Sequence, residues 1–503
     1  MSGMTVAGIV AVLVLNICIS VYSGEKVKNG RDFLTGGGKA GAGLVCGGIL
    51  GSLISGQSTI GTAQLAFHFG LSAWWFTLGS GLGCLALAFC FVCPLRRSGR
   101  VTELQIVCNE YGSIAETLGS VLNVMGIFLT VLVQVISCIG LFTLMFPSLT
   151  PLVAASLTVA AMCAYIVFGG AWGAGLGGMF KVGLLYLTLA ASFVIVLLNE
   201  GGLSGLATTL ASHLAGTPLG AVQNTANGLS NLPDVGALSE RFFNLLARGP
   251  GKDLGSCLSL ILGVLSTQTY AQAVWSAKND KDAKHGVLLG ALLCPPLGVA
   301  GILVGLSMRA HCVTAAEAAA LVVVGQGVPG GTVIASTVHV LPAFALEYFT
   351  PLAAGMLLGT LLVTVIGGGA GLTLGMAAIF VKDMGKLLFP SLSPRSELAF
   401  SRAVIVAILG VAAAIALAMP GKMLNDLGFL SMGLRAGVIF VPLCYALFLP
   451  GRICSGFVIA AMLLAPASMI AGQFFKLPFD SLLLGMCVAF AVCTMGVVFS
   501  SRR

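Results

Sequence analysis

Apolar residues fill most of this chain in runs of roughly 20 residues, separated by short polar connections. A helix needs a run of this length to cross the hydrocarbon core of a bilayer, so the pattern predicts about thirteen membrane-spanning helices and an all-α polytopic fold. The spans are expected near residues 4–23, 41–66, 69–94, 116–146, 150–169, 172–198, 254–275, 286–308, 349–381, 401–420, 425–449, 453–473 and 478–500.

Two of the expected spans are polar at their centres. The polar centres are Ser55, Gly56 and Gln57 in 41–66, and Thr267, Gln268 and Thr269 in 254–275. A purely anchoring helix would not carry them, because each unsatisfied polar group in hydrocarbon costs on the order of several kcal/mol. Transporters break their helices at such places, and the unwound backbone lines a site near the middle of the membrane. We therefore expect two broken helices, with these six residues as candidate solute contacts.

Composition supports a membrane protein and excludes several other classes. Of 503 residues, 57% are hydrophobic and only 8% are charged, with a mean hydropathy of +1.04, whereas soluble domains carry roughly a quarter charged residues. The 15 cysteines are scattered and are expected to be small buried apolar residues. No phosphate-binding loop, nucleophile–base set or metal-spaced cluster appears, so we expect neither an enzyme nor a bound cofactor. His68 is interpreted as a packing residue, with a proton relay as the alternative.

The net charge of +8 follows the expected membrane topology. By our count the connections on one side hold about 17 Lys and Arg against about 6 on the other, and the positive-inside rule puts the richer side in the cytoplasm. The N-terminus would then lie outside and the C-terminus inside a cytoplasmic membrane, with Met4–Ser23 retained as a first helix. Since topology accounts for the charge, no nucleic-acid partner is expected. The long connections predict short helices at Gly236–Leu246 and Thr314–Val324.

Motifs along the chain resemble those of the sodium:solute symporter family. In order, they are Arg31–Gly37, Ser55-Gly56 with Ile60-Gly61 and Trp75, Arg100 to Glu103 with Tyr111-Gly112, Gly169-Gly170, Ser276–Asp280, Lys382-Asp383, Pro442 and Gly456. The resemblance implies one transporter domain, 1–503, of the LeuT type. Inverted five-helix repeats would occupy 41–198 and 254–449, with an extra helix at 4–23 and two more at 453–500. It also implies inward transport of a small organic solute driven by sodium.

This sequence departs from the family at the implied sodium site. The resemblance places carbonyl ligands at Gly51 and Ile54 and two hydroxyl ligands at positions that here are Gly367 and Gly368. A hydroxyl remains one turn earlier, at Thr364. Without the two hydroxyls, sodium coupling through this site is in doubt.

A lysine lies on the sixth expected span, where the family commonly has a glutamine. The family's acidic residue three positions earlier is Gly178, and the lysine is Lys181. At bilayer depth a lysine costs about 2.5–3.5 kcal/mol by insertion scales, so it normally faces a cavity or partner. A buried lysine also loses its proton more readily. One hypothesis is that Lys181 replaces sodium, giving proton coupling or exchange; the alternative is that it extends to the membrane interface.

Arg435 and Gln134 are further polar residues within expected spans. A guanidinium suits bidentate binding of a carboxylate, which favours an amino acid or carboxylate solute. The alternative is a structural arginine bonded to backbone. Gln134 is either a solute contact or a polar link between helices.

Two functions remain open at this stage. The first is a secondary transporter of a small solute, coupled to sodium or to protons. If Arg435 contacts the solute, the solute is expected to be an anion. The second is a transport-derived membrane sensor working with a separate signalling partner; no output domain follows the last span, which favours transport. The solute, the stoichiometry and the oligomeric state are not specified by these patterns.

Overall fold

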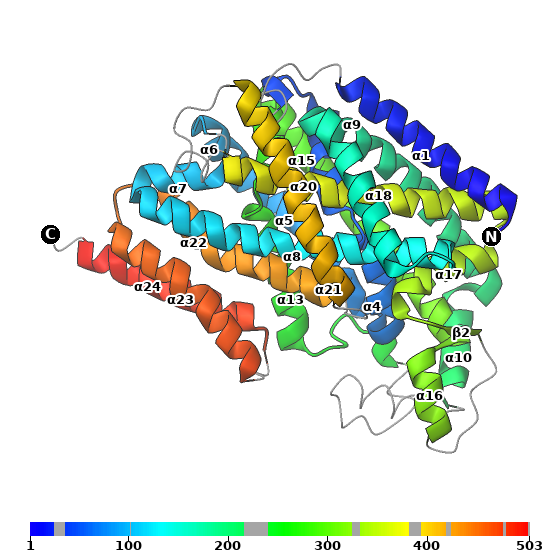
Figure 1. Cartoon of the computed structure of the whole chain (residues 1–503). Helices are drawn as coiled ribbons and strands as arrows, with labels where there is room; N and C mark the ends of the chain where they lie inside the picture. The colour runs from blue at the N-terminus through cyan, green and yellow to red at the C-terminus, as the bar shows by residue number, and fades with distance from the viewer. Residues whose placement is uncertain are drawn as a thin grey trace.

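A computed structural model describes residues 1–24, 36–100, 102–215, 240–323, 332–381, 394–418, 424–475 and 479–500. Nearly all of these residues are helical, which confirms the predicted all-α class (Figure 1). The motif residues 31–35 and Lys382-Asp383 lie outside the described residues, as does the beginning of the helix expected at Gly236–Leu246.

The N-terminal half contains one peripheral helix and the first broken helix. Its elements are α1 (Gly3–Gly24), η1 (Gly36–Gly38), α3 (Ala42–Leu53), η2 (Gln57–Gly61), α4 (Thr62–Phe69), η3 (Gly70–Trp74), α5 (Trp75–Ala86), η4 (Leu87–Phe91), α6 (Val92–Arg97), α7 (Glu103–Tyr111), α8 (Ser113–Met145), α9 (Pro151–Glu200) and α10 (Gly202–Ala215).

The C-terminal half contains the second broken helix and a two-stranded sheet. Its elements are α13 (Pro250–Leu265), α14 (Gln268–Ser276), α15 (Asp280–His311), β1 (Cys312–Thr314), α16 (Ala315–Val323), β2 (Thr332–Ile334), η5 (Thr337–His339), α17 (Val340–Tyr348), α18 (Pro351–Ile379), α20 (Pro394–Ala418), α21 (Leu424–Arg435), η7 (Ala436–Phe440), α22 (Val441–Phe448), α23 (Ser455–Phe474) and α24 (Ser481–Ser500).

Local sequence signals explain where several helices begin. Proline occupies the first turn of α9, α13 and α18, where its missing N–H is not needed. Asn279 caps α15 by accepting a hydrogen bond from the backbone N–H of Asp282 at 2.8 Å, and Thr102 caps α7 in the same way through Gln105 at 3.2 Å. The long spans therefore start at defined residues.

The bundle is built around α18. In its most apolar window 83% of α18 is buried, against 33% for α24. Helix α3 packs against α9, α15 and α14, while α1 lies along α18 and α9 at one edge of the bundle. The α23–α24 pair forms the opposite edge (Figure 1). Both broken helices are thus held inside the molecule.

The expected number of spans is not confirmed. By length and composition, 10 helices of the described residues could cross a membrane, or 11 if the pair α13 and α14, bent by 45°, is one span. Helix α9 covers two expected spans, 150–169 and 172–198. The helix predicted at Thr314–Val324 is confirmed as α16. The patterns did not predict the parallel pair β1–β2, in which Cys312 lies opposite Thr332.

Candidate functional site

The first broken helix interrupts its backbone after Leu53. Ile54 takes an extended conformation (φ −83°, ψ 105°), and the chain resumes as the wide turn η2 before α4. A helix end leaves carbonyl oxygens without partners inside the helix. The carbonyls of Gly51 and Ile54 are therefore available as acceptors at the break.

Lys181, on α9, reaches these carbonyls. Its ammonium group donates to Gly51 O at 2.5 Å, to Ile54 O at 2.7 Å and, on α18, to Thr364 O at 3.3 Å. The side chain is fully buried, and no ion pair found among the described residues includes it. Among the described residues, the Lys181 ammonium is therefore stabilised by carbonyl dipoles and by no carboxylate.

Glycines on α18 leave room for this contact. A Cβ at Gly367 would stand 3.6 Å from Lys181 Nζ and 3.3 Å from Tyr165 Oη, and a Cβ at Gly368 would press on Ser55 Cβ at 2.7 Å. The Thr364 hydroxyl donates to Thr360 O at 2.7 Å within its own helix, so Thr364 presents its carbonyl to Lys181. Positions 367 and 368, where the family resemblance leads us to expect hydroxyl side chains, carry none.

Close packing of α3 on α9 positions Lys181. A Cβ at Gly178 would collide with the carbonyl of Gly47, one turn before Gly51. An acidic side chain at this position has no space. Gly178 therefore allows the helix approach that carries the Lys181 ammonium to the Gly51 and Ile54 carbonyls.

Replacing Gly178 by alanine is expected to lower stability by about 1–3 kcal/mol, because an added methyl group in a filled contact forces the helices apart. Thermal unfolding of the purified protein measures the change. Gly183→Ala is the matched control on the same helix, since nothing lies within 4 Å of a Cβ at Gly183. Equal unfolding temperatures for the two variants would contradict this account of the packing.

Gln134, on α8, holds the first break in shape. Its Oε1 accepts from the backbone N–H of Gly56 at 2.8 Å, and its Nε2 donates to Ser55 Oγ at 3.1 Å. The hydroxyls of Ser58 and Thr59 donate to the Ser55 carbonyl at 3.0 and 2.9 Å. These bonds satisfy backbone groups that the break leaves unpaired.

The second break carries Arg435. Thr267 is extended (φ −108°, ψ 111°) between α13 and α14, and its Oγ1 accepts from Arg435 Nη1 at 2.7 Å. Arg435 Nη2 donates to Thr130 Oγ1 and to Ser431 Oγ, both at 3.2 Å. The side chain of Arg435 is fully buried, and every acceptor that it uses is neutral.

A buried acidic side chain lies near the same break. Glu103, at the first turn of α7, is 1% exposed, and its backbone N–H donates to Gln268 Oε1 at 3.0 Å. Its Oε2 has no hydrogen-bond partner among the described residues. Burial raises the pKa of Glu103 to about 8, although the charge of Arg435 lowers it. The carboxyl group is therefore largely protonated at neutral pH.

Glu103 should make stability fall as the pH rises. Its pKa is raised in the folded state. Its contribution to the free energy of unfolding is therefore fully present below the ordinary glutamate pKa near 4.5 and is lost as the pH approaches about 8. Unfolding temperatures of the native protein and Glu103→Gln, measured from pH 5 to 8, are expected to converge or cross in favour of the variant. A constant difference over this range would contradict the assignment.

The structure groups the predicted residues around the two breaks. Around the first break it brings together Gly51, Ile54, Ser55, Gly56, Gln134, Lys181, Thr364, Gly367 and Gly368. Around the second it brings together Thr267, Gln268 and Arg435, with Glu103 beside Gln268. Gln57 points toward Gly428 on α21, and Thr269 toward Gly375 on α18.

Sequence reasoning missed Thr130, Ser431 and Glu103 as parts of this site. A usable signal existed for one of them, because Thr130 and Gln134 are four residues apart on α8 and so share a helix face. Glu103 was recognised only as part of a motif. Its burial beside Gln268 joins segments that are 165 residues apart.

Comparisons with known proteins agree with this architecture. Residues 33–463 match the sodium:solute symporter family. The fold is similar to that of a Na+-coupled sialic acid symporter in a substrate-bound outward-open state, with a TM-score of 0.76 and 15% identity, over 100% of this chain and 98% of that one. It is also similar to a nucleobase-cation-symport-1 family transporter in a closed conformation with bromovinylhydantoin bound, with a TM-score of 0.50 and 13% identity, over 94% and 96%. No curated protein matches significantly in sequence. These likenesses confirm the predicted LeuT-type fold.

Proposed function

Since this chain belongs to the sodium:solute symporter family, we propose that it is a secondary transporter of a small carboxylate-bearing solute in which the Lys181 ammonium takes the place of a coupling sodium ion. Multi-pass membrane embedding and transport of a small solute, as opposed to an enzymatic reaction, follow from the family. The solute class, the coupling and the roles of residues are the proposal.

The contacts of Lys181 carry the proposal for coupling. In transporters of this fold, carbonyls at helix breaks coordinate the coupling cation, and here the Gly51 and Ile54 carbonyls accept hydrogen bonds from Nζ. The ammonium thereby joins α3, α9 and α18. Loss of its proton removes the charge that favours these bonds, so the first broken helix is released. Protonation from one side and deprotonation to the other couples solute movement to protons.

The surroundings of Arg435 carry the proposal for the solute class. Removing a charge from water is costly unless an opposite charge compensates for it, and the acceptors of Arg435 are hydroxyls, a backbone carbonyl and the sulfur of Met432. A carboxylate would supply the missing negative charge. The guanidinium also has the fork geometry that binds carboxylates in a bidentate manner.

Hydrogen bonds on both sides of the breaks support alternating access. Beyond the first break, Gln64 on α4 donates to Thr337 Oγ1 at 2.9 Å and accepts from the N–H of Leu424 at 3.2 Å. On the opposite side, Ala40 pairs with the end of α14 through Ser276 O at 2.9 Å and the N–H of Lys278 at 2.9 Å. Each set joins segments that must separate when its side opens.

The orientation is proposed from the placement of charge. Helix α15 has Lys281 and Lys284 in its first turns and Arg309 in its last. Arg96 joins the lysine-bearing end, through Asp280 at 2.6 Å. By the positive-inside rule this end is cytoplasmic, which places the N-terminus outside and the C-terminus inside a cytoplasmic membrane.

Uptake into proteoliposomes tests the proposal. A panel of labelled amino acids, other carboxylates and neutral sugars is offered, with sodium and proton gradients imposed separately. We expect accumulation of a carboxylate driven by the proton gradient and unaffected by sodium. Accumulation that requires sodium would overturn the role of Lys181, and exclusive uptake of neutral sugars would overturn that of Arg435.

A further inference from the structure

A cavity of about 400 Å³ lies between α13, α21, α23 and the start of α24, away from the two breaks. On α21 its wall is formed by Asp426, Phe429, Leu430 and Gly433. Ser431 and Arg435 on the same helix bond to Thr130 instead, on a different side. The cavity is therefore separate from the site proposed for the transported solute.

A buried guanidinium with a free donor lines this cavity. The side chain of Arg248 is 2% exposed, and its Nε donates to Asp253 Oδ1 at 2.7 Å. Its Nη2 donates to Ser256 Oγ at 3.2 Å, and the guanidinium carbon lies 5.2 Å from the centre of the Phe429 ring. Nη1 has no hydrogen-bond partner among the described residues. A buried unpaired donor costs about 1–3 kcal/mol, so this wall favours a ligand with an anionic oxygen.

The other charged groups of the cavity favour a cation as well. Lys252, Asp426 and Asp480 line it together with Arg248. Burial raises the pKa of Asp480, while Arg248 and Lys252 lower it and Asp426 raises it, so the four groups act on one another. Arg248 is already paired with Asp253, which leaves one lysine against two carboxylates. A ligand that carries both an anionic group and an ammonium group can pair with Arg248 and with the two carboxylates.

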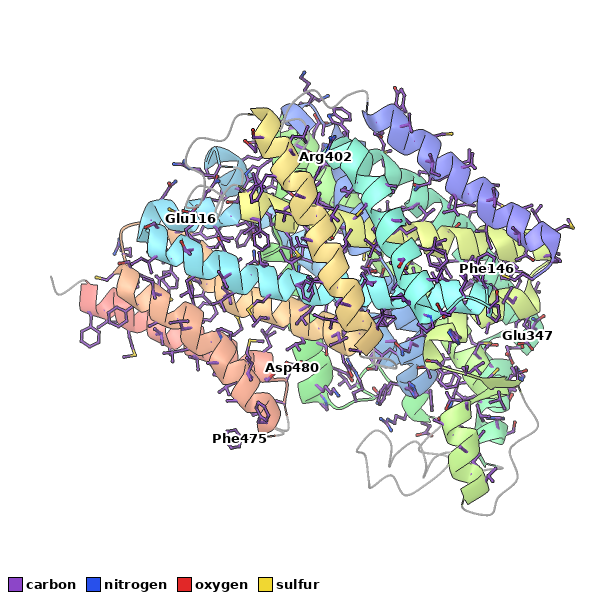
Figure 2. All side chains as sticks on the ribbon, viewed as in Figure 1. Glu116, Phe146, Glu347, Arg402, Phe475 and Asp480 are labelled. Carbon is purple, nitrogen blue, oxygen red and sulfur yellow. The ribbon has the colours of Figure 1, made fainter. Side chains whose placement is uncertain are left out.

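The mouth of the cavity is placed at the depth of lipid headgroups. The candidate spans Ser455–Gly472 and Ser481–Phe499 end and begin at this cavity, which Gly472 and Ser481 line, so its mouth lies where both helices leave the hydrocarbon core. Figure 2 shows Phe475 and Asp480 at the same end of the α23–α24 pair, next to α13. Phe479, Met469 and Leu482 add apolar lining beside the charges.

We propose that this cavity binds the headgroup of a phosphoethanolamine lipid, with the phosphate on Arg248 and Lys252 and the ammonium group on Asp426 and Asp480. Under the proposed orientation the lipid comes from the outer leaflet. Because the lipid would contact α13, half of the second broken helix, and α21, which carries Arg435, its binding joins the transport core to the α23–α24 pair. The binding itself does not depend on which solute is carried.

Native mass spectrometry of the full-length protein tests this site. The delipidated protein is titrated with phosphatidylethanolamine and, separately, with phosphatidylglycerol, which has the phosphate but no ammonium group. We expect phosphatidylethanolamine to be retained about tenfold more tightly, the equivalent of one charge-assisted contact. Equal retention of the two lipids would overturn the proposal.

Two variants localise the binding. Asp480→Asn keeps the helix cap that bonds the N–H of Leu482 at 2.9 Å, since asparagine also caps helices, and it should abolish the preference for the ammonium lipid. Lys252→Gln changes an exposed residue and should weaken both lipids. Asp280→Asn and Lys278→Gln, at the other end of the molecule, are the matched controls. Unchanged binding in both test variants would overturn the site, as would displacement of the lipid by free phosphoethanolamine at equal concentration.

Discussion

Replacing Lys181 by glutamine is expected to lower the initial rate of solute uptake about a hundredfold. The ammonium group donates three hydrogen bonds, and a neutral amide would take its place. Charge-assisted hydrogen bonds contribute about 1.5–3 kcal/mol each. The bonds to Gly51 O, Ile54 O and Thr364 O hold α3, α9 and α18 together. Uptake that remains should no longer respond to a proton gradient. Initial rates in proteoliposomes at several pH values measure both effects.

The control for this prediction is Lys281→Gln, since Lys281 is an exposed residue in the first turn of α15. It should transport like the native protein. A Lys181→Gln protein with full uptake that is independent of pH would show that Lys181 is structural.

A double variant separates the ammonium from the space that it fills. Lys181→Ala vacates the position of Nζ, and Gly367→Ser adds a hydroxyl where a Cβ is 3.6 Å from that position. Carbonyls and hydroxyls at a helix break are ligands for sodium, so uptake that returns should depend on sodium. The negative control combines Lys181→Ala with Gly368→Ser. Uptake should not return, because a Cβ at position 368 would lie 2.7 Å from Ser55 Cβ.

Replacing Arg435 by methionine is expected to raise the KM for a carboxylate solute at least about thirtyfold, because losing one partner of a buried charge pair costs about 2 kcal/mol or more. Arg435→Lys keeps the charge but cannot bond Thr267 and Thr130 at once, as the guanidinium does. It should recover part of the affinity. Concentration dependence of uptake measures the change.

Uptake of a neutral analogue of the solute shows whether Arg435 binds the carboxylate or only supports the folded structure. If Arg435 binds the carboxylate, an analogue with an amide in its place should be transported equally poorly by the native and variant proteins. A methionine variant that keeps the native KM for the carboxylate would show that Arg435 only bonds α21 to the second break.

Much of the architecture could be read from local patterns. Apolar runs identify the spans because a helix that crosses the bilayer needs about 20 predominantly apolar residues, whatever its neighbours. The polar centres at Ser55–Gln57 and Thr267–Thr269 mark the breaks for the same reason. The number of spans could not be obtained in this way, because the apolar helices Ala42–Leu53 and Pro151–Ile166 are too short to pass a length criterion.

The candidate site was only partly accessible to such reasoning. Lys181 and Arg435 stand out in the sequence because a charge at membrane depth is costly. Whether each reaches an interface or an interior partner depends on which helices pack against it. Gln134 was equally ambiguous until its bonds to Ser55 and Gly56 placed it at the first break.

The sequence alone specifies a multi-spanning helical protein with two interrupted helices, since hydrophobicity and helix interruption are properties of single segments. Tertiary structure specifies the partners. Lys181 meets a carbonyl 130 residues earlier and another 183 residues later, and Arg435 meets a hydroxyl 168 residues earlier. Such contacts depend on how helices from different parts of the chain pack, as the approach of Gly178 to Gly47 shows, and no local pattern encodes that packing.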